Sequence, residues 1–334
     1  MLWLGAYQLL FMDKVPSSAS INESVKLVKE IKQDYYSKLV NAVLHKIDND
    51  RQIPDDLSVK YSVPENLINM WKKQYGEDVL NEFLPCINDK PPLFAIPNKK
   101  FVNSDELLYE LECDGILGEA YDEFVLIENA NDLTASKAFK NGLFYIEDLS
   151  SFNCANALDA LSDDLVLDMC SAPGGKAFTI SQSMNNSGKI YCYDLHEHRL
   201  NLIKSSAKRL SIDNIYTDVN DATVYNENIP KADKILCDVP CSGFGIIRKP
   251  EIRYKDLDSV KDLPQIQYKI LETSSRYLKD GGRIIYSTCT LNKKENENVV
   301  NKFLKDHSGY KLLKEKTVFP STVGGDGFYY AIMV

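Results

Sequence analysis

The most informative motif for the fold of this chain is Asp168-Met-Cys-Ser-Ala-Pro-Gly-Gly-Lys176. It begins at the end of a short apolar run, Leu165–Cys170, and leads directly into a helical segment. Gly174 and Gly175 carry no side chains, so the backbone can approach a ligand closely where the helix starts. The pattern matches neither the GxGxxG of dinucleotide-binding proteins nor the phosphate-binding GxxxxGK[ST] motif. Taken alone, it predicts a strand, a turn and a helix.

On both sides of this unit, short apolar runs alternate with helical segments. The predicted strands are Leu165–Cys170, Lys189–Asp194, Asn214–Val219, Lys234–Val239 and Arg283–Cys289. Helices are predicted between most of them, such as His198–Leu210 and Gln265–Leu278. This alternation is typical of a doubly wound α/β fold, in which helices cover both faces of a mostly parallel sheet. Ligands of such folds bind beyond the carboxyl ends of the strands.

Acidic residues follow successive strands of the predicted sheet. Asp194 ends the second strand, about 20 residues after the glycine turn, where a carboxylate can bind the ribose of a nucleoside. Asp221 follows the third strand, from which it could reach an adenine amino group. Such residues are often helix caps instead. Their recurrence beside a glycine turn nevertheless favours a nucleoside-binding site.

Two cysteines also follow strands. Cys241 lies in Asp238-Val-Pro-Cys-Ser-Gly after the fourth strand, and Cys289 lies in Tyr286-Ser-Thr-Cys-Thr after the fifth. A cysteine is usually just a small buried apolar residue. Two thiols and an aspartate at one sheet edge instead suggest covalent catalysis. A thiolate that attacks carbon 6 of a cytosine makes carbon 5 nucleophilic enough to accept a methyl group, and the second thiol could help to release the adduct.

The remainder of the chain divides into two predicted parts. Residues 1–50 contain apolar residues at helical spacing, with Ser20 and Glu23 as a capping-box pattern. Residues 51–145 begin with a polar linker containing Pro54 and continue as a small α+β domain. Its predicted elements are the strands Leu93–Ile96 and Glu123–Ile127 and a helix at Asp105–Cys113. Residues 146–334 form the doubly wound domain, which Phe328–Val334 is predicted to close as an antiparallel edge strand.

Composition narrows the functional class. Of the 334 residues 44% are hydrophobic and 26% are charged, as in soluble globular proteins. No run of 18 apolar residues occurs, so we expect a cytoplasmic protein without a membrane span. The eight cysteines include no CxxC pair, which argues against a structural zinc site. We therefore expect no metal and reduced thiols.

Charge bears on the partner. The net charge of −9 weighs weakly against nucleic acid, because Lys and Arg drive phosphate binding. A local basic run at Arg248, Lys249 and Arg253 could still hold an RNA backbone.

These motifs, in this order and spacing, resemble the RNA 5-methylcytosine methyltransferase family. The resemblance extends to the segment Asp194–Arg199, to the terminal Gly325–Ala331 and to Glu147-Asp148, where the family usually has Gln-Asp. Upstream, the segments Leu4–Pro16 and Lys38–Ile47 resemble the later helices of a NusB-like RNA-binding domain, which implies a shortened form of that domain. The match covers nearly the whole chain, and the pair of cysteines is its most specific part.

The resemblance implies an S-adenosylmethionine (SAM)-dependent enzyme with a Rossmann-like catalytic domain, acting as a monomer on RNA and most often on 16S ribosomal RNA. Cys289 would be the nucleophile and Cys241 would assist breakdown of the adduct, while Asp238 and Lys176 would lie beside the target base. The residues implied in SAM binding are Cys170, Ser171, Ala172, Pro173, Gly174, Gly175, Lys176, Asp194, Arg199, Asp221 and Asp238. Those implied in RNA binding are Arg248, Lys249 and Arg253.

Three alternatives stay open. An enzyme that methylates an exocyclic amine would need an Asn/Asp-Pro-Pro-aromatic motif after the fourth strand, where this chain has Asp238-Val-Pro-Cys241. A member of the same family could act on transfer RNA or 23S ribosomal RNA. A non-catalytic ribosome assembly factor on the same fold would have no need of both thiols, and both are present.

Overall fold

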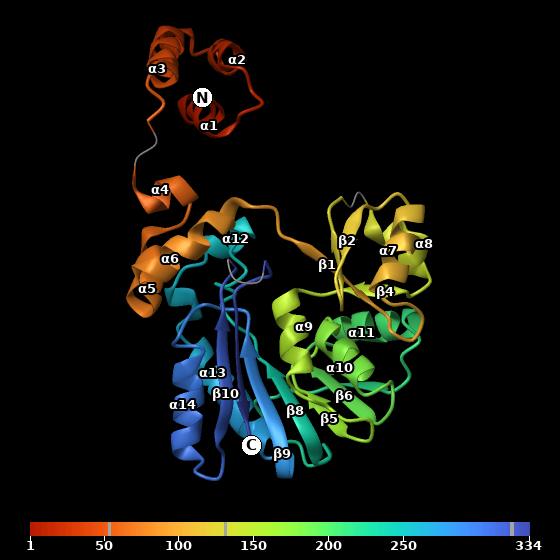
Figure 1. The fold of residues 1–334 in the computed structure, drawn as a ribbon. Helices are drawn as coiled ribbons and strands as arrows, with labels where there is room; N and C mark the ends of the chain where they lie inside the picture. The colour runs from red at the N-terminus through yellow and green to blue at the C-terminus, as the bar shows by residue number, and fades with distance from the viewer. Residues whose placement is uncertain (53–54, 130–131, 321–323) are drawn as a thin grey trace. The chain divides into compact units, whose positions relative to one another are not determined.

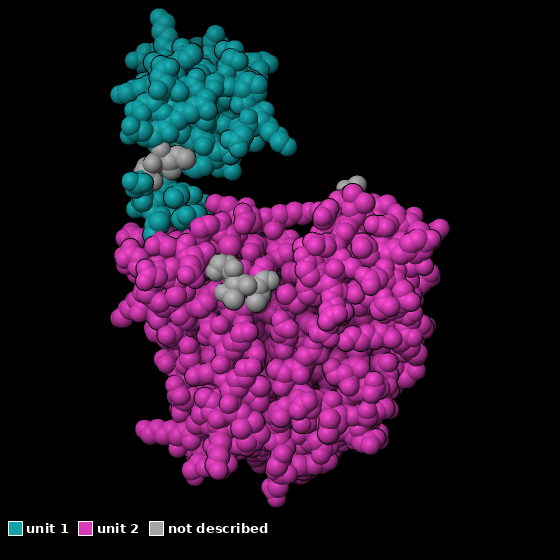
Figure 2. All heavy atoms as spheres, in the orientation of Figure 1, with its two compact units in different colours: residues 1–63 teal, residues 64–334 magenta. Residues whose placement is uncertain are grey.

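The computed structural model describes residues 1–52, 55–129, 132–320 and 324–334. These residues form two compact units, residues 1–63 and residues 64–334 (Figure 2). Pro54 of the predicted linker lies outside the described residues. The predicted boundaries after residues 50 and 145 stay predictions.

The first unit is helical. Its α-helices are α1 (Leu2–Phe11), α2 (Ser17–Glu30), α3 (Ser37–Asn49) and α4 (Leu57–Tyr61), with a short 3-10 helix, η1 (Asp34–Tyr36). Leu9, Val28 and Leu44 belong to its apolar core. The predicted capping box is wrong, because α2 already begins at Ser17. Ser20 is buried inside the helix, and its hydroxyl donates to the Gly5 carbonyl oxygen at 3.1 Å.

The second unit opens with helices and a small antiparallel sheet. Its first elements are α5 (Glu65–Tyr75), α6 (Glu77–Phe83), η2 (Leu84–Asn88), β1 (Leu93–Pro97), α7 (Ser104–Cys113), β2 (Gly118–Ala120), β3 (Val125–Ile127), η3 (Leu133–Ala135), α8 (Lys137–Lys140) and β4 (Phe144–Ile146). The strands pair in the order β2-β3-β1-β4. Helix α7 begins where Asn103 and Glu106 form a capping box, and it packs Leu107 and Leu111 into the core of this part.

A seven-stranded sheet forms the body of the second unit (Figure 1). Its strands are β5 (Leu165–Asp168), β6 (Lys189–Asp194), β7 (Ile215–Val219), β8 (Ala232–Asp238), β9 (Leu278–Thr288), β10 (Leu312–Val318) and β11 (Phe328–Met333). They pair in the order β10-β11-β9-β8-β5-β6-β7, and the five from β9 to β7 are parallel. The terminal strand β11 is antiparallel as predicted, but it is not an edge strand, because β10 covers it.

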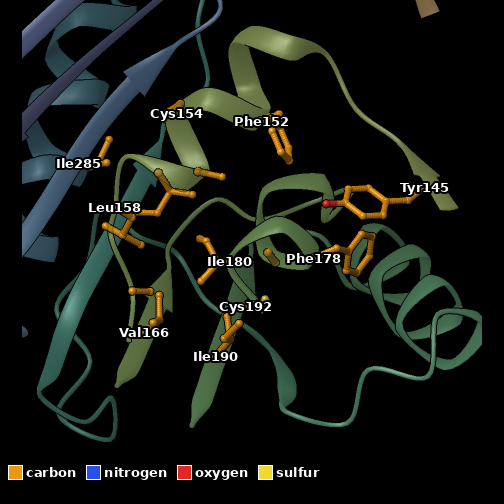
Figure 3. Close-up of a cluster of buried hydrophobic side chains, with 14 of the residues drawn as sticks. Tyr145, Phe152, Cys154, Leu158, Val166, Phe178, Ile180, Ile190, Cys192 and Ile285 are labelled. Atoms are coloured by element: carbon orange, nitrogen blue, oxygen red, sulfur yellow. The ribbon is translucent and has the colours of Figure 1, made fainter. Parts of the chain in front are cut away.

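Helices cover both faces of this sheet. The helical elements of this part are α9 (Leu149–Asn156), α10 (Gly175–Ser183), α11 (Glu197–Arg209), α12 (Pro250–Arg253), η4 (Asp258–Val260), α13 (Leu263–Ser275) and α14 (Glu297–Asp306). On β5, Val166 packs into the core that contains residues of α9, α10 and α11. Figure 3 shows Val166 among side chains of this core. The next residue, Leu167, packs into the core that contains residues of α13 and α14. Successive strand residues point to opposite faces, so both faces are buried and the predicted doubly wound fold is confirmed.

The strand order fixes where a ligand binds. The chain leaves β5 to form β6 and β7 on one side, and then returns to form β8 on the other side of β5. Adjacent strands whose connections run in opposite directions leave a crevice at their carboxyl ends. That crevice lies beyond Asp168 of β5 and Asp238 of β8.

Candidate active site

The glycine turn lies in this crevice, between β5 and α10. Gly174 has a φ of 108°, a conformation open to glycine but strained for other residues, and the helix begins at Gly175. A cavity of about 200 Å³ adjoins the turn. Its walls include these residues predicted to bind SAM: Cys170, Ser171, Ala172, Pro173, Gly175, Lys176 and Asp238.

Three further carboxyl groups, those of Glu147, Asp148 and Asp168, line the cavity and were not among the predicted site residues, and two of them are buried. Asp168 is 1% exposed, and neither of its oxygens has a hydrogen-bond partner among the described residues. Glu147 is 7% exposed, and its Oε1 likewise has none in the described part of the chain. Burial raises the pKa of both buried groups to about 7. Unpartnered buried carboxyl oxygens are costly, so the cavity suits a ligand that brings a cationic or N–H donor group.

Asp194 and Arg199 connect the next strand to the turn. The Asp194 Oδ1 accepts a hydrogen bond from the His196 amide at 3.0 Å, and its Oδ2 lies 2.9 Å from Nη1 of Arg199. Nη2 of Arg199 donates to the Ala172 carbonyl oxygen at 2.7 Å. Asp194 therefore fixes the backbone just before α11 and is an ion-pair partner that holds Arg199 against the glycine turn.

Asp221 lies in a second, more open cavity of about 710 Å³ beyond β6 and β7. Its Oδ1 accepts hydrogen bonds from the Thr223 amide at 2.9 Å and the Thr223 hydroxyl at 2.6 Å. Neighbouring Asn220 is buried, and its Nδ2 has no partner among the residues described. Leu195, Val219 and Val224 give this cavity exposed apolar walls, so it can accept a flat aromatic group with polar edges.

Lys176 and Asp238 form an ion pair at the mouth of the first cavity. The Nζ of Lys176 donates to Asp238 Oδ2 at 2.8 Å and to the Ser151 hydroxyl at 3.0 Å. The Ser287 hydroxyl donates to the other oxygen of Asp238 at 2.8 Å. Burial alone would lower the pKa of Lys176, but Asp238 and Glu147 outweigh it and hold that pKa above its ordinary value. Lys176 is therefore a cation fixed beside the crevice.

The two predicted cysteines converge. The Sγ atoms of Cys241 and Cys289 lie 3.0 Å apart, and both residues are half-buried. They meet because Asp238 of β8 pairs with Ser287 of β9, so each cysteine follows its strand at a similar level. The contact with Cys289, together with burial, raises the pKa of Cys241 well above its ordinary value. Cys241 therefore keeps its proton at neutral pH and can donate it in a hydrogen bond to the sulfur of Cys289.

The basic run Arg248, Lys249 and Arg253 was expected to face an RNA backbone, but two of its three side chains are buried. Arg248 is buried and donates to the Gly325 carbonyl oxygen at 2.8 Å. Arg253 is buried and donates to the carbonyl oxygens of Ile247 and Ile87. Both guanidinium groups thus bond to backbone within the second unit instead of facing outward, and only Lys249 of the three is exposed. A phosphate contact by Lys249 stays a prediction.

Neither a membrane span nor a metal centre is found among the described residues. Among the described residues, no helix is long and apolar enough to cross a membrane. The same residues contain no group of three or more His, Cys, Asp or Glu side chains that could hold a metal ion.

Comparison with known proteins agrees with this geometry. A probable ribosomal RNA small subunit methyltransferase B from Bacillus subtilis (strain 168) is 33% identical, over all of this chain and 81% of that protein. The crystal structure of PH0851 is 29% identical with a TM-score of 0.82, over 98% of this chain and 80% of that one. The structure of NSun6 from Pyrococcus horikoshii with SFG shares the fold, at 21% identity and a TM-score of 0.74, over 81% and 97% of the two chains.

Two family descriptions match separate parts of the chain. Residues 1–49 match the NusB family. Residues 155–334, which contain the glycine turn, the Lys176–Asp238 ion pair and both converging cysteines, match the description 16S rRNA methyltransferase RsmB/F. With more than half of the sequence matched in this way, the chain belongs to the RsmB/F family of 16S rRNA methyltransferases.

Proposed function

We propose that this SAM-dependent ribosomal RNA methyltransferase methylates carbon 5 of a cytosine in 16S ribosomal RNA through a covalent cysteine adduct. The observation that carries the proposal is the 3.0 Å approach of the Cys241 and Cys289 sulfur atoms beside the Lys176–Asp238 pair. Carbon 5 chemistry needs a nucleophilic thiol, for which a second thiol can serve as the base, and neither thiol has a place in the methylation of an exocyclic amine.

SAM supplies an electrophilic methyl group. The unpartnered oxygens of Asp168 and Glu147 suit the ammonium group of its methionine part, and the backbone of Gly175 at the start of α10 suits the carboxylate. Asp194 would hold the ribose. Asp221 and Asn220, in the more open cavity, would meet the polar edge of the adenine.

Cys289 would attack carbon 6 of the cytosine. The new sulfur–carbon bond makes carbon 5 electron-rich, and carbon 5 then takes the methyl group. Before attack, the Cys241 S–H can donate a hydrogen bond to the Cys289 sulfur. Asp238 would accept a hydrogen bond from the cytosine edge, and the Lys176 cation, which is paired with Asp238, would offset negative charge that develops on the base.

Cys241 would then complete the reaction. Once Cys289 is bonded to carbon 6, it no longer raises the pKa of Cys241. Cys241 can then lose its proton to solvent, because the residue is only half-buried. The resulting thiolate takes the proton from carbon 5, the double bond reforms, and Cys289 leaves as a thiolate. The products are methylated RNA, S-adenosylhomocysteine as the leaving group of the transfer, and free enzyme.

The test is methyl transfer from tritiated SAM into unmodified 16S RNA, with Cys241→Ala and Cys289→Ala. We expect incorporation by the wild type, with bisulfite sequencing placing the product on a cytosine. Cys289→Ala should lose at least about a hundredfold in rate, because the nucleophile is absent. Cys241→Ala should accumulate an RNA adduct that survives denaturing electrophoresis.

Cys113 offers a control, because it is an exposed thiol in α7. Cys113→Ala should behave as the wild type in both measurements. Incorporation by Cys289→Ala at the wild-type rate, or the absence of a trapped adduct with Cys241→Ala, would overturn the covalent mechanism. Product on transfer RNA or 23S RNA alone would overturn the assignment to 16S RNA.

A further inference from the structure

A clamp of hydrogen bonds holds the segment that carries Cys241. The Pro240 carbonyl oxygen accepts a hydrogen bond from Nε2 of Gln267 at 2.9 Å. The Ser242 carbonyl oxygen accepts one from Nζ of Lys255 at 2.8 Å. The Ser242 hydroxyl lies 2.7 Å from the Thr290 hydroxyl. The residues directly beside Cys241 are thus fixed from α13, from the loop after α12 and from the residue that follows Cys289.

Glu295 is the centre of this clamp. Its side chain is 0% exposed. The Oε2 accepts hydrogen bonds from the Ser242 amide at 2.9 Å and from Nε2 of Gln267 at 3.0 Å, and the Oε1 accepts one from Nδ2 of Asn292 at 2.8 Å. All three donors are uncharged. A carboxylate is rarely buried without a cation, so its presence here calls for an explanation beyond packing.

We propose that Glu295 is a positioning residue that holds the Cys241 thiol against Cys289 through the Ser242 amide. In this proposal Glu295 contacts neither the substrate nor the reacting atoms. It accepts a hydrogen bond directly from the Ser242 amide, and it also accepts one from Gln267, whose side chain donates to the Pro240 carbonyl oxygen. Glu295 therefore acts on the backbone on both sides of Cys241. Its negative charge also disfavours early ionisation of Cys241. The inference rests on the proposed covalent mechanism and concerns the step in which the adduct is released.

The position of Glu295 predicts which step fails without it. Cys289 follows β9 and keeps its own backbone contact, in which its carbonyl oxygen accepts from the Gly245 amide at 3.0 Å. Loss of Glu295 therefore displaces Cys241 more than Cys289. Attack and methyl transfer should continue, whereas removal of the carbon 5 proton and release of the RNA should slow.

The experiment compares Glu295→Ala, Glu295→Gln and Cys241→Ala with the wild type. Single-turnover methyl transfer, the lifetime of the denaturant-resistant adduct, SAM affinity by calorimetry and thermal unfolding are measured for each. We expect Glu295→Ala to lengthen the adduct lifetime about tenfold or more, as loss of a charged hydrogen-bond acceptor would, with methyl transfer within a few-fold of wild type. Glu295→Gln keeps one acceptor for the Ser242 amide and should lie between Glu295→Ala and the wild type.

Glu297→Gln is the matched control. It makes the same change two residues further along, on a half-buried side chain whose Oε2 has no hydrogen-bond partner among the described residues. It should release RNA at the wild-type rate. If Glu295→Ala does not fold, Gln267→Met carries the test, because it removes the bonds to Pro240 and Glu295 from α13 and leaves both cysteine loops unchanged in sequence.

Two results would overturn the inference. One is an adduct lifetime equal to that of the wild type in a folded Glu295→Ala variant. If Glu295→Ala does not fold, the same result in a folded Gln267→Met variant has the same meaning. The other is a proportional loss of methyl transfer and release together with a lower melting temperature, since a purely structural role gives that pattern. Absence of any adduct with Cys241→Ala would instead overturn the proposed function itself. A trapped adduct with Cys241→Ala but not with the clamp variants would remove only the role of Glu295.

Discussion

At the scale of single residues, the site contains carboxyl groups in three different environments. Glu295 is buried and fully hydrogen-bonded, Asp238 is paired with Lys176, and Glu147 is buried with one oxygen unpartnered. The Oε2 of Glu147 accepts from the Thr179 hydroxyl at 2.5 Å. The Thr179 hydroxyl can in turn accept from the Tyr145 hydroxyl at 2.7 Å. These bonds direct the free oxygen of Glu147 toward the SAM cavity.

Glu147 should make the stability of the protein depend on pH. Burial raises its folded pKa to about 7, against the opposing attraction of Lys176 and with further repulsion from Asp148 and Asp238. The unfolded carboxyl ionises near its ordinary pKa of 4.5. Between these two values the folded state holds a proton that the unfolded state has lost, so the contribution of this group to stability falls as pH rises from about 4.5 to about 7.

Glu147→Gln removes this titration. The variant should gain stability relative to wild type between pH 5 and pH 8 by roughly 2 kcal/mol, measured by urea unfolding at both values. Glu110→Gln, which changes an exposed carboxylate of α7, should follow the wild type at both pH values. An equal difference between Glu147→Gln and wild type at both pH values would contradict the prediction.

At the scale of elements, the loop after β8, which carries Cys241, is packed against the backbone of Cys289 and against the segment before β11. The loop after β8 and the segment before β11 approach so closely that Gly245 and Gly327 are in backbone contact, with the Gly327 amide donating to the Gly245 carbonyl oxygen at 2.9 Å. A Cβ on Gly245 would lie 2.0 Å from the Gly327 carbonyl oxygen and 2.8 Å from that of Cys289. No side chain fits between these backbones.

Gly245→Ala should therefore separate the loops. We expect it to lower the free energy of unfolding by about 1–3 kcal/mol, as overpacking of a rigid site does, and to slow adduct formation because the Cys289 loop moves. Gly309→Ala is the comparison, since a Cβ there has nothing within 4 Å, and its unfolding free energy should stay within about 0.5 kcal/mol of wild type. Wild-type stability and adduct formation in Gly245→Ala would show that the loops can yield.

The sequence predicts the strands that have a strong local pattern of apolar residues. It does not predict strands that form only because they pair with another strand. The apolar runs of β5, β6, β8 and β9 and the convergence of Cys241 and Cys289 follow from the rule that parallel strands end at one edge. The strand β10, by contrast, reads Leu-Leu-Lys-Glu-Lys-Thr-Val and is mostly exposed, so only its pairing with β11 reveals it.

Side chains with distant partners were also missed. Asp168 carries the same signal as Asp194, an acid at a strand end, and could have been assigned from the sequence. Glu147 stands out in the sequence only as part of the Glu147-Asp148 pair, because the strand β4 before it has just three residues. Glu295 has no local signal, because it contacts Ser242 and Gln267, which lie far from it along the chain. The sequence places Arg253 in a basic run that is expected to be exposed. Its burial could not be predicted, because its acceptor, the carbonyl oxygen of Ile87, comes from a distant part of the sequence.

At the scale of the whole molecule, the two units have separate cores. The core that contains Leu9, Val28 and Leu44 belongs entirely to residues 1–63. The residues proposed for SAM binding and catalysis all belong to residues 64–334. Cofactor binding and RNA recruitment can therefore be separated by dividing the chain between the units.

We predict that residues 64–334 alone fold and bind SAM with an affinity within about twofold of the full chain, because no proposed contact to the cofactor is removed. The net charge of −9 gives the full protein little general attraction for RNA. If the NusB-matching unit supplies RNA contacts, the shortened chain should show a higher KM for 16S RNA with kcat nearly unchanged, since uniform binding is lost and the reacting groups are kept. Calorimetry and tritium transfer at several RNA concentrations measure both quantities. Unchanged KM would place RNA recognition within residues 64–334, and loss of SAM binding would show that the two cores depend on each other.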